Sequence, residues 1–383
     1  MVALQKFNAG TVVEWRLLPG NIFNFVFWTF KPCIDGFSHC RPVISIDDTH
    51  VYGVYDIKLL IAVGMDVNVS IFPLVFAIAA NKSNETWGMF LTHLRSYIIK
   101  DHMGICVLSD RHHDIFTQWL QWSINKKMAC KDGDDQGSES KAYTWLKKIK
   151  VEKWTLYADE GWRWGTLTTN SSESFNDLLK SARGLPVTAM VRITFMQVVE
   201  WFVTRTKHVK AILAEGERWM PKSKKLMEHH REKCELLKMT EYNLAERVFE
   251  VRTGYYEDRG GNLHTVYEGT RTCSCGKWQA YHMPCSHAVK CFESIGKTVS
   301  SYVASEYNVK SYFKAYASHF YPLGDQAYWP NEPFSMAANK EYDAILVAPR
   351  SPMWNQGEEL QGSQGVYMKM STREHALAPF RRS

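Results

Sequence analysis

Long uninterrupted apolar runs are few in the sequence, and we expect no segment that crosses a lipid bilayer. Its two most apolar windows, LLIAVGMDV and FPLVFAIAA, are too short and too interrupted to span a hydrocarbon core. The first residues, MVALQKFNAG, have no apolar run after their one lysine, so we expect no secretory signal peptide. Internal repeats are also absent. These absences predict a globular protein of the reducing cell interior with no membrane-embedded part.

A strong excess of charge of either sign is absent too. The chain has 46 Lys and Arg residues against 40 Asp and Glu residues, a net charge of +6. This mild excess permits contact with nucleic acid but does not argue for it, because an ordinary solvated surface has the same balance. With 45% hydrophobic residues and 14 tryptophans among 383 residues, the chain is typical of a folded protein of two or three domains.

The cysteines do not form a disulfide framework. They number nine, an odd count, and four stand apart from any partner in sequence: Cys33, Cys106, Cys130 and Cys234. In a reducing compartment, a compact group of cysteines and histidines is a metal site rather than a pair of disulfides. Such a group lies in TCSCGKWQAYHMPCSHAVKC, residues 272–291.

Residues 41–128 have an α/β pattern. Three β-branched or apolar runs, VISI, KLLIAVGMD and IFPLVFAIAA, are joined by short connections and predict an antiparallel meander. SNETWGMFLTHLRSYIIK then has apolar residues at helical spacing, with Ser83 or Asn84 as N-cap. The short run ICVL predicts a fourth strand and HDIFTQWLQWSI a following helix. The expected order is β-β-β-α-β-α.

The remainder of the chain is mainly helical up to the cysteine group. Residues 129–142 read as a loop, a helix begins near Asn170, and the stretch from Val187 to about Leu237 is helical in character. AERVFEVRTG and NLHTVYEGTRTCSCG predict a hairpin that leads into the cysteines, and SHAVKCFESIG predicts a short helix after them. The tail from about residue 335 has no clear pattern.

Cys273, Cys275, Cys285 and His287 are the expected metal ligands. Zinc takes four nitrogen or sulfur ligands in a tetrahedron, and two cysteines two positions apart on a strand end point to one face. The second pair closes the site from the start of the next helix, with turns at Gly276 and Pro284. With all four positions filled, the zinc is structural rather than catalytic. The alternative is that these four residues are buried cysteines with a chance histidine. We assign Cys291 to the core rather than to the ligand set.

The C-x-C…C-x-H pattern resembles the SWIM-type zinc finger. Its flanks resemble those of plant Mutator-like (MULE, MuDR) transposases, and so do phrases upstream: FKPCIDGFSHCRPVISIDDTHVYG, ETWGMFLTHLR, GICVLSDRH and TTNSSESFNDLLKSARGLP. The resemblance runs through most of residues 10–205 and resumes at the finger. It implies an α/β fold with an RNase H-like core and a DDE triad of carboxylates.

Transferred by position, the triad is Asp47, Asp110 and Glu173. In the family such acids hold two Mg²⁺ or Mn²⁺ ions, which activate a water or 3′-hydroxyl for in-line attack on a DNA phosphodiester. Each acid alone has a simpler explanation: a turn residue at a strand end, a helix cap, or one half of a capping box. Where relatives have Asp-Gly-Thr-His, this chain has Asp48 in place of the glycine.

The sequence departs from the family between the second and third acids. No good run for a fifth strand is present there, VEKWTLYA being the nearest candidate, and Cys130 is not followed by the histidine of a Cys-x-x-His motif. We interpret residues 129–142 as the seam of an internal deletion or of a mis-joined exon, which leaves the fourth strand as a sheet edge and misplaces Glu173. The segment before the transposase domain is also short. We therefore expect weak or absent strand transfer.

The resulting division of the chain has five parts. They are a truncated N-terminal segment (1–40), an RNase H-like domain with an internal deletion (41–185), a helical region (186–240), the finger with its hairpin (245–300) and a C-terminal tail (301–383).

The first functional hypothesis is a transposase-derived, zinc-binding nuclear protein that contacts DNA, either terminal inverted repeats or chromatin. The residues expected to contact DNA surround the finger: Arg271, Lys277, Trp278, Tyr281, His282 and Lys290. The alternatives are an active DDE transposase, a degenerate transposon fragment, and a zinc-dependent module for protein–protein interaction. Oligomeric state and target sequence stay open.

Overall fold

The computed structural model describes residues 1–51, 57–80, 83–102, 104–109, 127–130, 159–166, 170–180, 185, 187–243, 245–254 and 261–330. All of them belong to one compact unit, Met1–Ile345. The helix expected at HDIFTQWLQWSI, the VEKWTLYA run and the tail beyond residue 330 lie outside the described residues.

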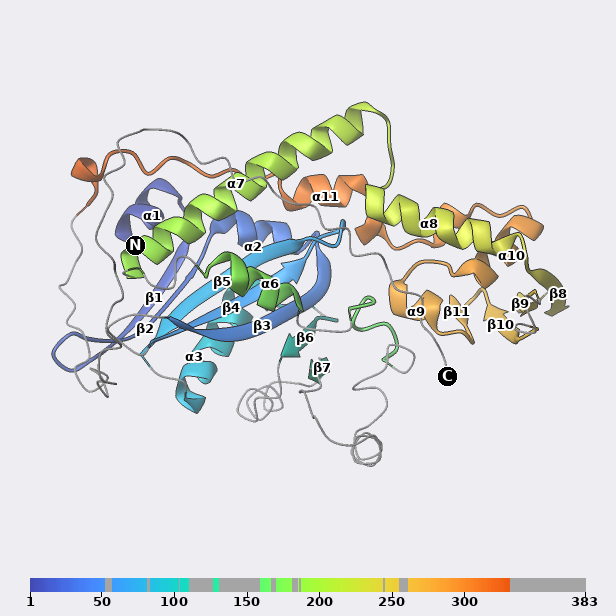
Figure 1. Ribbon diagram of the computed structural model, residues 1–383, viewed down its shortest axis with the longest axis horizontal. Helices are drawn as coiled ribbons and strands as arrows, with labels where there is room; N and C mark the ends of the chain where they lie inside the picture. Colours follow the sequence, from blue (N-terminus) through green and yellow to red (C-terminus); the bar gives the residue numbers. More distant parts are fainter. Residues whose placement is uncertain are drawn as a thin grey trace, which may run out of the picture. The chain divides into compact units, whose positions relative to one another are not determined.

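A seven-stranded mixed sheet forms the centre of the fold (Figure 1). Its strands are β1 (Val12–Leu18), β2 (Ile22–Thr29), β3 (Arg41–Val51), β4 (Ile57–Met65), β5 (Ile71–Ala79), β6 (Cys106–Ser109) and β7 (Lys127–Cys130). They lie in the order β1-β2-β5-β4-β3-β6-β7. The antiparallel meander β3-β4-β5 is confirmed, and β6 runs parallel to β3 as a fourth strand beside the first.

The expectation that the fifth strand is missing is wrong. Lys127–Cys130 pairs in parallel with all four residues of β6, so β5-β4-β3-β6-β7 has the 3-2-1-4-5 order of an RNase H-like core. β6 is therefore not a sheet edge. The strand escapes detection because KMAC is only four residues long and runs directly into the polar stretch KDGDDQG.

The N-terminal forty residues extend this sheet. They supply β1 and β2, with β2 pairing antiparallel to β5, together with α1 (Val2–Phe7) and α2 (Lys31–Phe37). β4 and β5 are buried along almost their whole length, as expected of central strands covered on both faces.

Four further helices pack on this core. They are α3 (Asn84–Leu94), which continues as a π-helical turn to Ile99, α6 (Asn170–Leu178), α7 (Val187–Ala214) and α11 (Val309–Ala315). Ser83 is the N-cap of α3, as predicted, because its side chain accepts a hydrogen bond from the backbone N–H of Thr86. α11 lies within residues 301–383, which the sequence assigned to a tail, and its Tyr312 is buried in the core.

By length and composition, α7 is a helix that could cross a membrane. Its apolar face is occupied in the fold, however, because Phe195 packs against Phe30, the N-cap residue of α2, and Phe202 packs against Phe72 of β5 and against Phe320. The length and composition of α7 are thus explained by its place in the core of the described unit.

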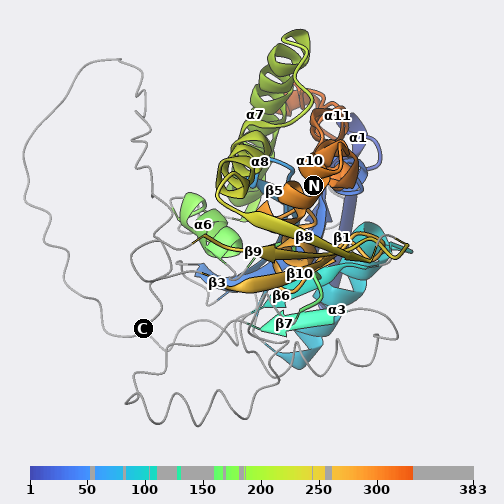
Figure 2. The ribbon, with the colours of Figure 1, turned by 90° about the vertical axis from the view of Figure 1, so that its right-hand side faces the viewer.

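The finger has a small sheet of its own. β8 (Lys238–Asn243), β9 (Val248–Arg252), β10 (Leu263–Tyr267) and β11 (Thr272–Cys273) form an antiparallel sheet in the order β11-β10-β9-β8 (Figure 2). The predicted hairpin is confirmed as β9-β10. Three helices accompany it: α8 (Pro221–Cys234), α9 (Lys277–Tyr281) and α10 (Ser286–Ser294).

The single helical stretch expected from Val187 to Leu237 is in fact two helices. α7 ends before Gly216, which has a left-handed φ of +75°, and α8 begins at Pro221. Glycine and proline therefore separate the two helices, as their backbone preferences require.

Candidate metal centre and acidic site

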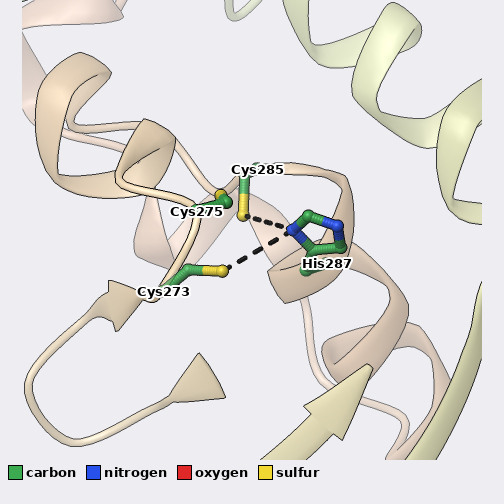
Figure 3. A group of neighbouring side chains, drawn as sticks. All are labelled: Cys273, Cys275, Cys285 and His287. Carbon is green, nitrogen blue, oxygen red and sulfur yellow. Dashed lines mark hydrogen bonds between the residues drawn. The ribbon is translucent and has the colours of Figure 1, made fainter. Parts of the chain in front are cut away.

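Cys273, Cys275, Cys285 and His287 converge on one point (Figure 3). Their ligand atoms all lie within 4.8 Å of one another. Nδ1 of His287 faces the thiols, at 3.6 Å from Sγ of Cys273 and 3.9 Å from Sγ of Cys285. The structure thus brings together the four residues that the sequence predicts as ligands.

Turns and helix starts place the four side chains. Cys273 ends β11, whereas Cys275 lies in the turn after it and not on the strand as expected. That turn is closed by the Gly276 N–H donating to the Cys273 carbonyl at 2.9 Å, and Gly276 has a left-handed φ of +73°. Cys285 is the N-cap residue of α10 and His287 lies in its first turn.

The donor set fits zinc. Three thiolates and one imidazole nitrogen within reach of one point are a closed tetrahedral site. In the protein alone, hydrogen bonds that the Cys273 thiol donates to Cys275 and Cys285, followed by burial, raise the pKa of Cys273. A divalent cation would supply the positive charge that such crowded thiolates need.

Cys291 is not one of the ligands, as predicted. It is fully buried among the apolar residues of the finger, and burial is the main cause that raises its pKa to about 12. It is an inert core thiol.

Two residues beside the cluster were missed by sequence reasoning. Gln279 makes a reciprocal pair with the Cys273 backbone, accepting from its N–H at 3.2 Å and donating to its carbonyl at 3.0 Å. His264 stacks on His287, with ring centroids 4.1 Å apart. Both contacts join separate elements, and nothing in their sequence spacing points to them.

On the core, Asp47 and Glu173 come from β3 and α6. Asp47 is half-buried and accepts a hydrogen bond of 2.7 Å from Nδ2 of Asn176 on α6. Glu173 is half-buried in the first turn of the same helix, three residues before Asn176 and therefore on the same face. Asn176 is a third residue that the sequence did not single out.

Asp110 lies outside the described residues. The register next to it is clear, since Ile46 of β3 pairs with Ser109 of β6 in parallel. In the sequence, Asp47 follows Ile46 and Asp110 follows Ser109. Asp48 is half-buried, and its N–H donates to Oδ1 of Asp47 at 2.8 Å.

Two of the six finger residues expected to contact DNA are engaged inside the protein. Trp278 is buried in the finger core. His282 is held against residues 159–166, with its Nε2 at 2.8 Å from the Gly161 carbonyl. Trp278 is therefore not available for stacking on DNA and Nε2 of His282 is already engaged, whereas Arg271 and Lys277 are exposed.

Comparison with known families gives two matches. The MULE transposase domain matches residues 43–121, which include β4 to β6 and all but the first two residues of β3, and the SWIM zinc finger matches residues 264–296, which include all four cluster residues. A search of curated proteins finds no significant match.

Proposed function

We propose that this chain, which combines a Mutator-like transposase domain with a SWIM zinc finger, is a transposase-derived zinc protein of the nucleus that binds duplex DNA. The zinc is structural, held by the three cysteines and His287. Nuclear location follows from the DNA partner and is part of the proposal.

The supporting observation is a cationic face on α8, which we define as Lys225, His229 and Lys233. These residues are four apart, so they share one helix face at a rise of about 6 Å per step. All three are exposed, and within the described residues none of them forms an ion pair. Glu228 and Glu232 border this face on one side.

Two other cations of α8 are already neutralised. Lys224 pairs with Glu217 at 2.6 Å and Arg231 pairs with Glu293 at 3.0 Å. The finger adds Lys277, which lies close enough to α8 to help lower the pKa of His230, after burial and His229. Exposed lysines that form no ion pair within the described part of the chain, here Lys225 and Lys233, are the feature that binds a phosphate backbone.

The salt dependence of binding tests the proposal. We compare two variants of equal charge on one helix: Lys225→Gln/Lys233→Gln on the cationic face and Lys224→Gln/Arg231→Gln outside it. Removing two phosphate contacts should lower the slope of log K against log salt by about 1.8 and weaken binding at 0.15 M salt about 30-fold. The probe is a 30-base-pair duplex of arbitrary sequence, measured by fluorescence anisotropy.

Equal losses in the two variants would contradict the proposal. So would equally tight binding of an acidic polypeptide of matched charge, which would favour the protein-interaction module instead. Zinc content is measured in both variants to show that the finger is intact.

A second candidate function is DDE strand transfer with Mg²⁺ or Mn²⁺. The fifth strand and the Asn176–Asp47 bond favour it, because they remove the reason for expecting a misplaced Glu173. The test is cleavage of terminal-repeat DNA with either metal. Activity that disappears in Asp47→Asn and Asp110→Asn would support it, whereas no cleavage would leave the chain as a DNA-binding protein.

A further inference from the structure

A buried loop, residues Asp159–Thr166, lies between the finger and the large sheet. Its carboxylate Asp159 is fully buried and accepts backbone N–H bonds from Gly161 at 2.8 Å and Arg163 at 3.1 Å. Nε of Arg163 lies 3.4 Å from the same carboxylate. The loop is thus closed around its own ion pair, and the finger packs against the surface that this turn presents.

The finger sits directly on this loop. His282 donates from Nε2 to the Gly161 carbonyl, and its ring stacks on Trp164 with centroids 4.0 Å apart. The loop and the finger approach each other so closely that a Cβ added to Gly161 would lie 2.2 Å from the Gln279 carbonyl oxygen. A Cβ on Gly165 would lie 2.4 Å from the Tyr281 ring.

The sheet holds the other side of the loop. Arg41, at the start of β3, donates to the carbonyls of Trp164 at 3.5 Å and Val67 at 3.3 Å. Trp164 also belongs to a buried apolar cluster shared by the sheet and the finger: Val43, Cys106, Leu108, Trp164, Met283, Val303 and Tyr307. The loop is therefore packed between the finger and the large sheet, which are far apart in the sequence.

The contacting part of the finger lies between its two pairs of zinc ligands. Gln279, Tyr281 and His282 fall after Cys275 and before Cys285, so a metal held by both pairs fixes the two ends of this segment. Without the metal, the same segment becomes a longer free loop with a higher conformational entropy.

The loop also leads directly to the acidic site. Thr166 is followed after three residues by α6, which carries Glu173 and the Asn176 that donates to Asp47. We propose that zinc loading of the finger orders loop 159–166 and, through it, the docking of α6 on β3. The finger then acts as a clamp that makes the arrangement of the acidic residues depend on zinc. The inference rests on the zinc site of the proposed function but not on DNA binding.

Hydrogen exchange followed by mass spectrometry on the full chain tests the clamp. Removing zinc with a chelator should raise exchange at least ten-fold in residues 159–166 and 170–178, as well as in the finger. Gly161→Ala and His282→Asn should raise exchange in the same two segments while zinc stays bound. Asparagine suits the left-handed φ of +51° at position 282 but removes the ring contact.

Gly216→Ala is the matched control for Gly161→Ala. Both glycines have left-handed φ values, +75° at Gly216 and +84° at Gly161. A Cβ at position 216, however, meets nothing within 4 Å. This variant should change exchange only near the α7–α8 turn.

The proposal is overturned if chelation changes exchange in the finger alone, or if both clamp variants keep wild-type protection in 159–178. Since no DNA is present, these results are independent of the salt-dependence test. A chain that fails to bind DNA can therefore still show the clamp, and the reverse also holds.

Discussion

Asn176 donates a hydrogen bond of 2.7 Å to the carboxylate of Asp47, and this bond joins α6 to β3. Asn176 is buried and Asp47 is half-buried, so the bond is partly shielded from water, and its acceptor is a carboxylate. It is the contact that sets the position of Glu173 relative to the sheet, because Glu173 and Asn176 share one face of a short helix.

Asn176→Ala should therefore destabilise the protein by about 2 kcal/mol, the usual cost of losing a hydrogen bond to a charged group. Asn176→Asp should cost more at pH 7, because it places a second carboxylate against Asp47. Protonation removes that repulsion, so the extra cost should disappear as the pH falls below about 3.5. Urea unfolding of the two variants across this pH range measures it. An extra cost that persists at low pH would contradict the explanation.

Cys285→Ser should abolish metal binding, since one of four zinc ligands is lost. Zinc content should fall from about one ion per chain to none, and the finger should lose its cooperative unfolding transition. The matched control is Cys291→Ala, another buried thiol on the same finger helix, which should keep its zinc. Metal analysis and calorimetry of the two variants distinguish a ligand from a core cysteine.

His230 makes the finger sensitive to acid. Burial is the main cause that lowers its pKa to about 4, and its Nε2 has no hydrogen-bond partner among the described residues. His230 therefore binds a proton near pH 6.5 in the unfolded chain but not in the folded chain. Its contribution to the free energy of unfolding is fully present above that pH and is lost as the pH falls.

Between pH 7 and pH 5 this linkage should remove about 2 kcal/mol of unfolding free energy. His230→Gln should lack this part of the pH dependence. The difference between the two proteins, measured by urea unfolding while zinc content is monitored, is the relevant quantity. Parallel curves for the two proteins would show that His230 does not carry the effect.

Gly36 should not tolerate a side chain. A Cβ there would lie 2.1 Å from the Ala315 carbonyl oxygen and 2.7 Å from the Phe72 ring, at the contact between α2 and α11. Gly36→Ala should destabilise the fold by about 2 kcal/mol through overpacking. Gly269→Ala, where a Cβ meets nothing within 4 Å, should be close to neutral in the same thermal unfolding assay.

What the sequence predicted correctly was encoded locally. Long apolar runs predict the meander β3-β4-β5. The spacing of the cysteines and the histidine predicts the ligand set, Cys273, Cys275, Cys285 and His287. The four-residue strand β7 was missed because its stability comes from pairing with β6, which no local pattern records.

The contacts that join distant segments were also missed. Asn176 and His282 look ordinary in the sequence, one as a polar helix residue and the other as a polar residue in a finger loop. Their roles appear only when the fold brings α6 to β3 and the finger to Gly161. For the same reason His282 was assigned to DNA contact, because its charge is visible in the sequence and its docking is not.

β1 forms one border of the large sheet, and its two charged side chains are both tied to the helical segment after β5. Arg16 pairs with Glu85 at 2.6 Å, and Tyr97 donates to Glu14. An uncovered strand with free backbone groups invites a second chain to pair with it, and charges on such a strand discourage this. The charges on β1 should therefore hinder the pairing of this edge strand with a strand of another molecule. If the sheet grows into aggregates, that growth should not begin at β1.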